Sequence, residues 1–167
     1  MEYIFIGKIV STHGIKGEIK IISDFDFKDK AFKVGNRIYI GKEKEELVIA
    51  SYRRHKNYEM ITMDGYNNIN EVLHFMREPV YLIKEDLNLD DNEYLDSSLI
   101  GVSIYCDNEL LGEIIEIFCP SPNRKVIRFK DDGKTYLVPY MQNFVKKIDL
   151  PLKKMILYSK EGVLECE

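Results

Sequence analysis

The stretch that decides the fold is Tyr3–Ile21, which reads YIFIGKIVSTHGIKGEIKI. β-branched and aromatic residues dominate Tyr3–Val10, and such residues favour the half-buried surface of a pleated sheet. Farther along, Ile19–Ile21 alternates apolar and basic side chains with the period of two that is typical of a strand. Gly14 and Gly17 lie between these runs and permit positive φ, so the chain can reverse there. The stretch therefore predicts two strands joined by a tight turn.

Runs of the same kind recur along the chain, separated by Gly, Asn and Asp residues that favour turns. The further predicted strands are Arg37–Ile40, Leu47–Arg53, Tyr58–Met63, Val80–Ile83, Val102–Tyr105, Leu110–Phe118, Lys125–Phe129, Thr135–Val138, Phe144–Ile148 and Met155–Tyr158. Many short strands with turns between them are typical of small barrels. We therefore expect a mainly β fold.

One short helix is predicted near the end of the first half. Asn68 can cap it, and Glu71 three residues later completes a pair that resembles a capping box. Pro79 blocks its continuation. The predicted apolar stripe, with helical spacing, consists of Ile69, Val72, Leu73 and Met76.

Charge divides the chain into two parts. Residues 1–84 carry 14 Lys/Arg and 12 Asp/Glu, a net of +2, whereas residues 85–167 carry 10 and 16, a net of −6. The stretch 85–93 contains five acids, no base and no hydrophobic periodicity. Such a stretch is typical of a solvated linker. We therefore predict one domain over residues 1–84, an acidic linker over 85–93 and a second domain over 94–167.

The sequence contains none of the common catalytic motifs. There is no G-x-S-x-G, no H-E-x-x-H and no G-x-x-x-x-G-K-[ST]. All three histidines lie in the first half and all three cysteines in the second, so a Cys–His pair would have to form across the domain boundary. This spacing also does not suit zinc. We expect no catalytic residue, no metal and no cofactor; the alternative is an enzyme centred on His13 and Lys16.

The cysteines also bear on the cellular compartment. Their number is odd and no C-x-x-C occurs, which argues against a disulfide framework and favours the reducing cytoplasm. Cys106 and Cys119 lie in apolar strand contexts, which predicts buried thiols. No apolar run approaches the roughly 18 residues of a membrane span. The N-terminus lacks the basic region of a signal peptide. We therefore expect a cytoplasmic protein without a membrane segment.

Two basic clusters are candidates for contact with RNA. Arg53, Arg54 and Lys56 form a dense run that can either grip phosphates or remain the solvated end of a strand. The second basic cluster is either a solvated face or an RNA contact, with Arg124 and Lys125 as the residues expected to touch RNA. Its members are Arg124, Lys125, Arg128 and Lys130. The sequence leaves both alternatives open for each cluster.

Four segments together resemble the RimM family of bacterial ribosome maturation factors, which are also called 16S rRNA processing proteins. The first, Ile6–Val10 followed by His13–Glu18, is similar to the family's opening G-x-I-V…H-G-I-K-G-E signature. The others, in chain order, are Glu93–Leu95 with Leu99–Gly101, then Tyr136–Tyr140 with Phe144-Val145, and finally Glu161–Glu165. They occur near the family's spacing and extend over nearly the whole chain.

The resemblance implies an architecture and a function. The architecture is an N-terminal translation-factor-like β-barrel followed by a C-terminal PRC barrel. Proteins of this family associate with the free 30S subunit, bind the small-subunit head ribosomal protein number nineteen, and help the head of the 16S rRNA mature. They are not known as enzymes. We therefore expect a non-catalytic assembly factor, acting as a monomer, with a stand-alone RNA-binding module as the alternative.

The resemblance also implies where the partners bind. The family's tyrosine pair at the start of the second barrel is tied to binding of the ribosomal protein; here Tyr94 matches, but the second position is Leu95. Leu95 keeps apolar contact area and lacks the hydroxyl. The residues expected at this interface are Tyr94, Leu95, Leu99, Ile100 and Gly101. The residues that carry the N-terminal motif are His13, Gly14, Lys16 and Gly17.

Overall fold

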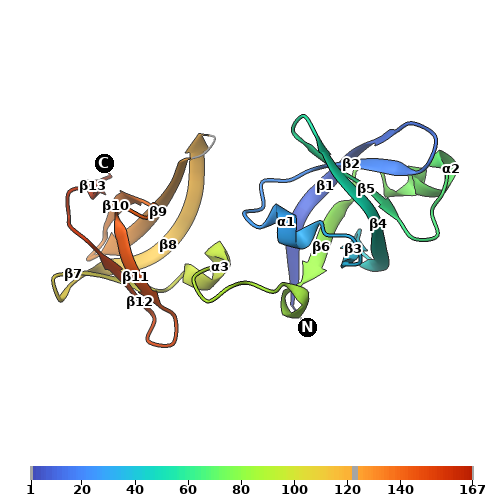
Figure 1. Ribbon diagram of the computed structural model, residues 1–167. Helices are drawn as coiled ribbons and strands as arrows, with labels where there is room; N and C mark the ends of the chain where they lie inside the picture. Colours follow the sequence, from blue (N-terminus) through green and yellow to red (C-terminus); the bar gives the residue numbers. More distant parts are fainter. Residues whose placement is uncertain (1, 122–123, 167) are drawn as a thin grey trace. The chain divides into compact units, whose positions relative to one another are not determined.

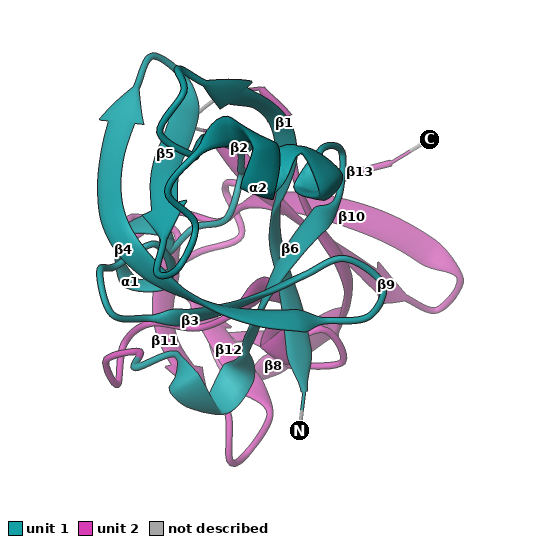
Figure 2. Ribbon diagram, turned by 90° about the vertical axis from the view of Figure 1, so that its right-hand side faces the viewer, with its two compact units in different colours: residues 1–88 teal, residues 89–167 magenta. Residues whose placement is uncertain are grey.

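The computed structural model describes residues 2–121 and 124–166 and divides the chain into two compact units. Unit 1 comprises residues 1–88 and unit 2 comprises residues 89–167 (Figures 1 and 2). The division therefore falls between Asn88 and Leu89, inside the acidic stretch. Both units are built mainly from short antiparallel strands, which confirms the prediction of a mainly β fold.

Unit 1 is a closed barrel in which the strands follow the order β1-β2-β5-β4-β3-β6. The strands are β1 (Tyr3–His13), β2 (Glu18–Ile22), β3 (Arg37–Ile40), β4 (Glu45–His55), β5 (Tyr58–Met63) and β6 (Pro79–Ile83). Closure joins β1 to β6, so the barrel has no unpaired edge strand among the described residues. Two long strands, β1 and β4, change register part-way, and such irregularities help a strand bend around a barrel.

The alternation seen in the sequence accounts for the barrel core. Ile19 and Ile21 are fully buried, as their period of two predicts. Gly7 lies where β1 crosses the end of β2, and a Cβ atom there would come within 2.7 Å of the Ile22 carbonyl oxygen. A side chain at this position does not fit, so the glycine permits close approach of the two strands. Other large buried side chains of this core are Phe32, Phe75, Ile6, Ile9, Ile38, Ile49, Ile61 and Met63.

The predicted helix is shorter than its apolar stripe suggested, and it continues as a 3-10 turn instead of an α-helix. Unit 1 contains α1 (Lys28–Ala31), α2 (Ile69–Val72) and the 3-10 turns η1 (Leu73–Phe75) and η2 (Lys84–Asp86). The Asn68 side chain caps α2 by accepting a hydrogen bond from the Glu71 backbone N–H, as predicted. The assignment of Leu73 to the buried stripe was wrong: Leu73 is exposed and Phe75 is buried. The tighter 3-10 turn rotates the chain so that Phe75 reaches the core instead.

Unit 2 begins with α3 (Asp96–Leu99) and continues as a seven-stranded sheet of order β11-β12-β7-β8-β9-β10-β13. The strands are β7 (Ser103–Cys106), β8 (Glu109–Ser121), β9 (Arg124–Asp131), β10 (Lys134–Pro139), β11 (Val145–Asp149), β12 (Lys154–Leu157) and β13 (Leu164–Glu165). The long strands β8 and β9 curve (Figure 1), and the concave arrangement encloses a second core. That core includes Leu99, Ile104, Ile114, Ile127, Phe129, Val138 and Met155.

The two strand cysteines differ in environment. Cys106 is buried in the core of unit 2, and burial raises the pKa of its thiol. Cys119 is exposed, so the prediction that it is buried was wrong. It lies near the end of β8, where the register against β9 shifts between Phe118 and Ser121, and there the regular inward alternation ends.

No helix within residues 2–121 and 124–166 is both long enough and apolar enough to cross a membrane.

Candidate functional site

The glycine turn between β1 and β2 is fixed by its neighbours. Gly17 is buried with φ at 89°, and a Cβ atom there would lie 3.0 Å from the Tyr66 carbonyl oxygen. The Ile15 carbonyl accepts a hydrogen bond from the Ile69 N–H at 2.9 Å, which ties the turn to the start of α2. Gly14 has φ at 69° and open space around it. The turn is therefore rigid at its second glycine and accessible at its first.

Two side chains of the N-terminal motif remain exposed on this turn. His13 and Lys16 are both accessible to solvent. The His13 ring lies 6.2 Å, centroid to centroid, from the ring of His55 on β4. Lys16 and His13 line a shallow depression together with Ile15, Glu18 and Thr62. The turn thus presents a small surface of mixed apolar and polar character.

Arg53, expected to contact RNA, is engaged in a bidentate pair. Its Nε donates to Glu18 Oε2 at 2.9 Å and its Nη2 donates to Glu18 Oε1 at 2.8 Å. The hydrogen bond from Arg53 lowers the pKa of the Glu18 carboxyl below its ordinary value. The pair joins β4 to the start of β2, so Arg53 links two strands of the barrel while its side chain remains partly exposed.

Arg54 is engaged by a buried carboxylate. Glu59 is only 1% exposed, and its Oε1 accepts hydrogen bonds from Arg54 and from the Tyr52 hydroxyl, the latter at 2.8 Å. Burial and the hydrogen bond to Glu59 raise the pKa of Tyr52 to about 12. A buried carboxylate requires such partners, because an unpaired charge in the interior is costly. Arg54 therefore neutralises the buried Glu59 carboxylate and is not free to bind a phosphate.

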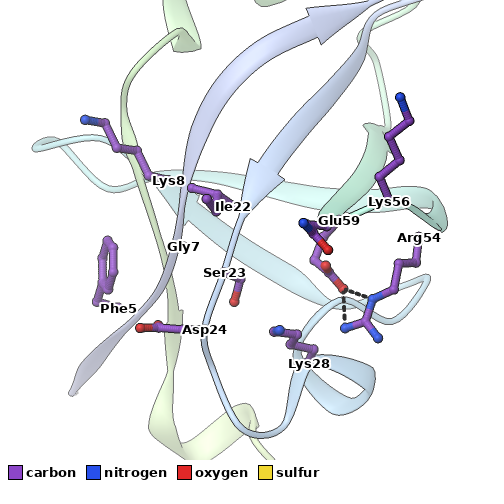
Figure 3. Close-up of a pocket in the computed structure, with 11 residues that line it drawn as sticks. Phe5, Gly7, Lys8, Ile22, Ser23, Asp24, Lys28, Arg54, Lys56 and Glu59 are labelled. Atoms are coloured by element: carbon purple, nitrogen blue, oxygen red, sulfur yellow. Dashed lines mark hydrogen bonds and ion pairs between the residues drawn. The ribbon is translucent and has the colours of Figure 1, made fainter. Parts of the chain in front are cut away.

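Lysines beside this pair are not engaged in the same way. Lys8, Lys28 and Lys56 line one pocket with Arg54 and Glu59 (Figure 3). Figure 3 shows Arg54 directed at the Glu59 carboxylate, whereas Lys56 points away from it. None of the three lysines forms a salt bridge within the described part of the chain. The sequence analysis identified Lys56 but not Lys8 and Lys28. These two residues come from other segments and line the same pocket only once the barrel has folded.

The segment at the start of unit 2 contains both buried and accessible members. Leu95 and Leu99 are buried, so their side chains anchor the segment and do not face a partner. Ile100 is 48% exposed, and Tyr94 is partly exposed with its hydroxyl 3.4 Å from the Ile148 carbonyl oxygen. Gly101 has φ at 88° and its N–H donates to the Ile114 carbonyl at 2.8 Å. The accessible contact groups of this segment are therefore Tyr94 and Ile100.

Tyr94 borders a groove that the sequence did not reveal. The groove is lined by Tyr140, Met141 and Val145, with Asp91, Lys146 and Lys147 also on its wall. The side chain of Met141 is exposed, and Tyr140 is half-buried. An accessible aromatic and apolar strip with a polar rim is typical of a protein contact surface.

Two members of the second basic cluster form ion pairs within unit 2. Lys125 Nζ lies 2.9 Å from Asp96 Oδ1, which joins β9 to α3, and it also lies 5.6 Å from the centre of the Tyr140 ring. Arg128 pairs with Glu116 on the neighbouring strand. Arg124 is exposed at the start of β9. Of the two residues predicted to contact RNA here, Lys125 is thus engaged within the unit and Arg124 is accessible.

Among the described residues, no three His, Cys, Asp or Glu side chains are grouped so that they could hold a metal ion.

The chain is therefore a β-rich protein of two units, a closed barrel followed by a seven-stranded sheet. Each unit has an accessible pocket on its surface. The model of the RimM N-terminal domain matches residues 4–87, and that of the RimM PRC barrel domain matches residues 96–163. The chain belongs to the RimM family. This confirms the resemblance drawn from the sequence motifs and the prediction of a PRC barrel.

Curated relatives match over almost the full length. The Ribosome maturation factor RimM of Listeria monocytogenes is 38% identical over 167 residues, which cover 96% of each chain. That of Staphylococcus aureus is 39% identical over 166 residues, covering 96% of this chain and 98% of its own. Among solved structures, a RimM protein of Pseudomonas aeruginosa is 24% identical with a TM-score of 0.48, covering 95% of this chain and 98% of that one.

Proposed function

We propose that this chain is a ribosome maturation factor that binds the assembling 30S subunit through the head ribosomal protein number nineteen and assists maturation of the 16S rRNA head. The observation that carries the proposal is the near-full-length similarity to proteins named Ribosome maturation factor RimM, which extends through both units. The protein acts in the cytoplasm, as a monomer and without catalysis.

The groove beside Tyr94 is the proposed site for the ribosomal protein. Tyr94 and Met141 offer accessible aromatic and apolar area, the kind of surface that supplies most of the affinity at a protein interface. Asp91 lies on the wall of the groove, and Asp90 and Glu93 lie close to it in the sequence of unit 2. Because ribosomal proteins are basic, these carboxylates increase the rate of encounter. Leu95 is buried, so an apolar side chain without a hydroxyl suits its position.

The lysine pocket of unit 1 is the proposed contact for rRNA. Lys8, Lys28 and Lys56 have no internal ion pair within the described chain, so phosphates can neutralise them without breaking the barrel. Arg53 and Arg54 remain bound to Glu18 and Glu59, so the lysines supply the charge that phosphates would neutralise. Arg124 is the accessible member of the contact proposed on β9.

Isothermal calorimetry with purified small-subunit head proteins tests the protein contact. We expect the chain to bind protein nineteen tightly. It should bind the other head proteins weakly or not at all. Tyr94→Ala should weaken binding, and Tyr94→Phe should preserve most of it because the hydroxyl makes only a long bond to Ile148. Equal binding of all head proteins, or unchanged binding by Tyr94→Ala, would contradict this site.

The alternative is a stand-alone RNA-binding module, which the unpaired lysines around one pocket favour. In that case rRNA affinity should be high in the absence of the ribosomal protein and should fall steeply with salt. Weak binding of rRNA fragments with a flat salt response would exclude this alternative and leave the protein-directed proposal intact.

A catalytic role for His13 and Lys16 makes a different prediction. In a strain that depends on this chain, an enzyme centred on His13 would lose growth complementation when His13 is changed to alanine. We expect complementation by His13→Ala, because the ring faces solvent and its nearest ring neighbour is His55. Failure of a folded His13→Ala chain to support growth would favour the enzymatic alternative.

A further inference from the structure

The outer face of the unit 1 barrel carries aromatic rings where polar side chains are the norm. Tyr3 and Phe5 lie on β1 and alternate with the inward Ile4 and Ile6. Tyr81 lies opposite Phe5 on β6, and Tyr39 lies opposite Tyr81 on β3. The four rings therefore occupy one outer face of three adjacent strands.

The rings contact one another edge to face. Ring centroids are 5.3 Å apart for Tyr3 and Tyr39, 6.4 Å for Tyr3 and Tyr81, and 6.0 Å for Phe5 and Tyr81. This arrangement fixes the rings and leaves area uncovered, since Phe5 is 53% exposed and Tyr3 is 38% exposed. Fixed, exposed aromatic faces are suited to stacking a planar ligand.

Cations flank the aromatic face at both ends. Lys44 Nζ lies 4.2 Å from the centre of the Tyr81 ring and 5.4 Å from that of Tyr3. At the other end, Phe5 lines the same pocket as Lys8 and Lys28 (Figure 3). Of the carboxylates near the rings, Glu2 pairs with Lys84 and Glu46 accepts from the Tyr39 hydroxyl, whereas Asp24 lines the same pocket as Phe5. Lys8, Lys28 and Lys44 outnumber this one carboxylate, so the face keeps a net positive charge.

We propose that this aromatic face binds a single-stranded segment of RNA, whose bases stack on the exposed rings of Phe5 and Tyr3 while its phosphates contact Lys8 and Lys44. Sequence-tolerant single-strand binding sites combine these two elements, aromatic faces for the bases and a cationic track for the backbone. The inference deepens the rRNA contact proposed for unit 1 and rests on it. It specifies an unpaired strand instead of a duplex.

Charge argues against a second copy of this chain as the occupant. In a symmetric dimer across this face, Lys8 and Lys44 of one copy would approach the same lysines of the other. Like charges brought together in a dry interface oppose association. An anionic strand with exposed bases matches both the rings and the lysines, so the polyanion is the better fit.

The absence of tryptophan from the sequence permits a direct test. Phe5→Trp places a single indole on the aromatic face of the full-length chain, and its emission can be excited selectively over that of the tyrosines. We expect a short oligouridine to quench its emission, because a stacked base lies against the indole. An abasic oligomer of the same length and charge should bind more weakly and quench little. Quenching that is equal with the abasic oligomer, or absent with both, would overturn the proposal.

Two further variants separate stacking from other causes. Phe5→Leu retains an apolar side chain without a π face, and we expect it to lower oligouridine affinity about tenfold. Tyr158→Ala removes another exposed aromatic side chain, 57% accessible, and should leave the affinity unchanged. If Phe5→Leu binds as the unaltered chain does, or if Phe5 instead controls concentration-dependent dimerisation, the proposal is wrong. Unchanged binding of these variants to the head protein would show that the broader function stands independently.

Discussion

The two units differ in the side chains that surround their accessible pockets. Unit 1 holds Arg53 and Arg54 in pairs with Glu18 and Glu59, and the lysines around one pocket have no ion pair within the described residues. In unit 2 the cations on β9 at Lys125 and Arg128 pair with carboxylates. What remains accessible there is the groove beside Tyr94, in which aromatic and apolar side chains lie among polar and charged ones. Unit 1 is thus better suited to a polyanion and unit 2 to a protein.

The lesson of this difference is that net charge describes a surface poorly. The first half of the chain has a net charge of only +2, and its densest basic run is the part most fully paired. The candidate phosphate contacts are isolated lysines from three segments: Lys8, Lys28 and Lys56. Strand register decides which Lys and Arg side chains remain available to bind phosphates, because it determines which carboxylate lies opposite each of them.

The largest effect should come from the groove of unit 2. We expect Tyr94→Ala to weaken binding of the head ribosomal protein by about thirtyfold, the scale of a central aromatic contact. Tyr105→Ala is the matched control, because Tyr105 is a partly exposed ring on the same unit that Lys154 covers at 5.1 Å. If calorimetry shows that the two variants lose equal affinity for the head ribosomal protein, the groove beside Tyr94 is not its specific binding site.

The second effect concerns the buried pair of unit 1. Arg54→Ala leaves the buried Glu59 carboxylate with Tyr52 as its remaining partner, and an incompletely satisfied buried acceptor costs about 1–3 kcal/mol of unfolding free energy. Arg53→Ala should cost less, since both partners of that pair contact solvent. Urea unfolding measures both. A larger loss for Arg53→Ala would contradict the structural role assigned to Arg54.

A smaller effect is expected at the lysine pocket. Lys56→Gln should reduce the salt dependence of RNA binding by about 0.7 in the slope of log affinity against log salt, the contribution of one single-strand phosphate contact. Arg128→Gln on unit 2 is the control, because Glu116 already neutralises that guanidinium. Identical slopes for Lys56→Gln and the unaltered chain would exclude Lys56 from the phosphate contacts.

The smallest effect is on the pH dependence of stability. The folded pKa of Glu18 lies below its ordinary value of 4.5 because Arg53 donates to the ionised form. The pair therefore stabilises the fold above the unfolded pKa, and this contribution is lost as pH falls through the lower, folded pKa. Arg53→Gln should accordingly differ from the unaltered chain near neutral pH and converge with it in acid. A constant difference at every pH would show that the lost stability comes from packing instead.

Much of the fold could be predicted, because alternation and turn residues act locally. Arg37–Ile40 and Tyr58–Met63 are strands over the ranges that the sequence predicted. The stripe through Leu73 was wrong, since periodicity assumes an α-helix and the chain tightens into a 3-10 turn. Cys119 was placed inside because an apolar context does not reveal a change of register.

The candidate sites were less accessible to sequence reasoning, because they depend on closure of the barrel. Tyr3 and Phe5 have strand propensity whether they face inward or outward, and only the pairing of β1 with β6 brings them beside Tyr81. The engagement of Arg54 by Glu59 likewise requires the β4–β5 register. Tyr94 was identified through family motifs, whereas its neighbours Tyr140 and Met141 became visible only in the groove.

Sedimentation of the chain with ribosomal particles tests the central claim most directly. In a gradient of lysate from cells that are assembling ribosomes, the account predicts that the chain travels with immature small subunits and is nearly absent from finished 70S particles. A folded Tyr94→Ala chain should shift toward the top of the same gradient. Absence of the unaltered chain from small-subunit fractions, or equal occupancy of 70S particles, would contradict its assignment as an assembly factor.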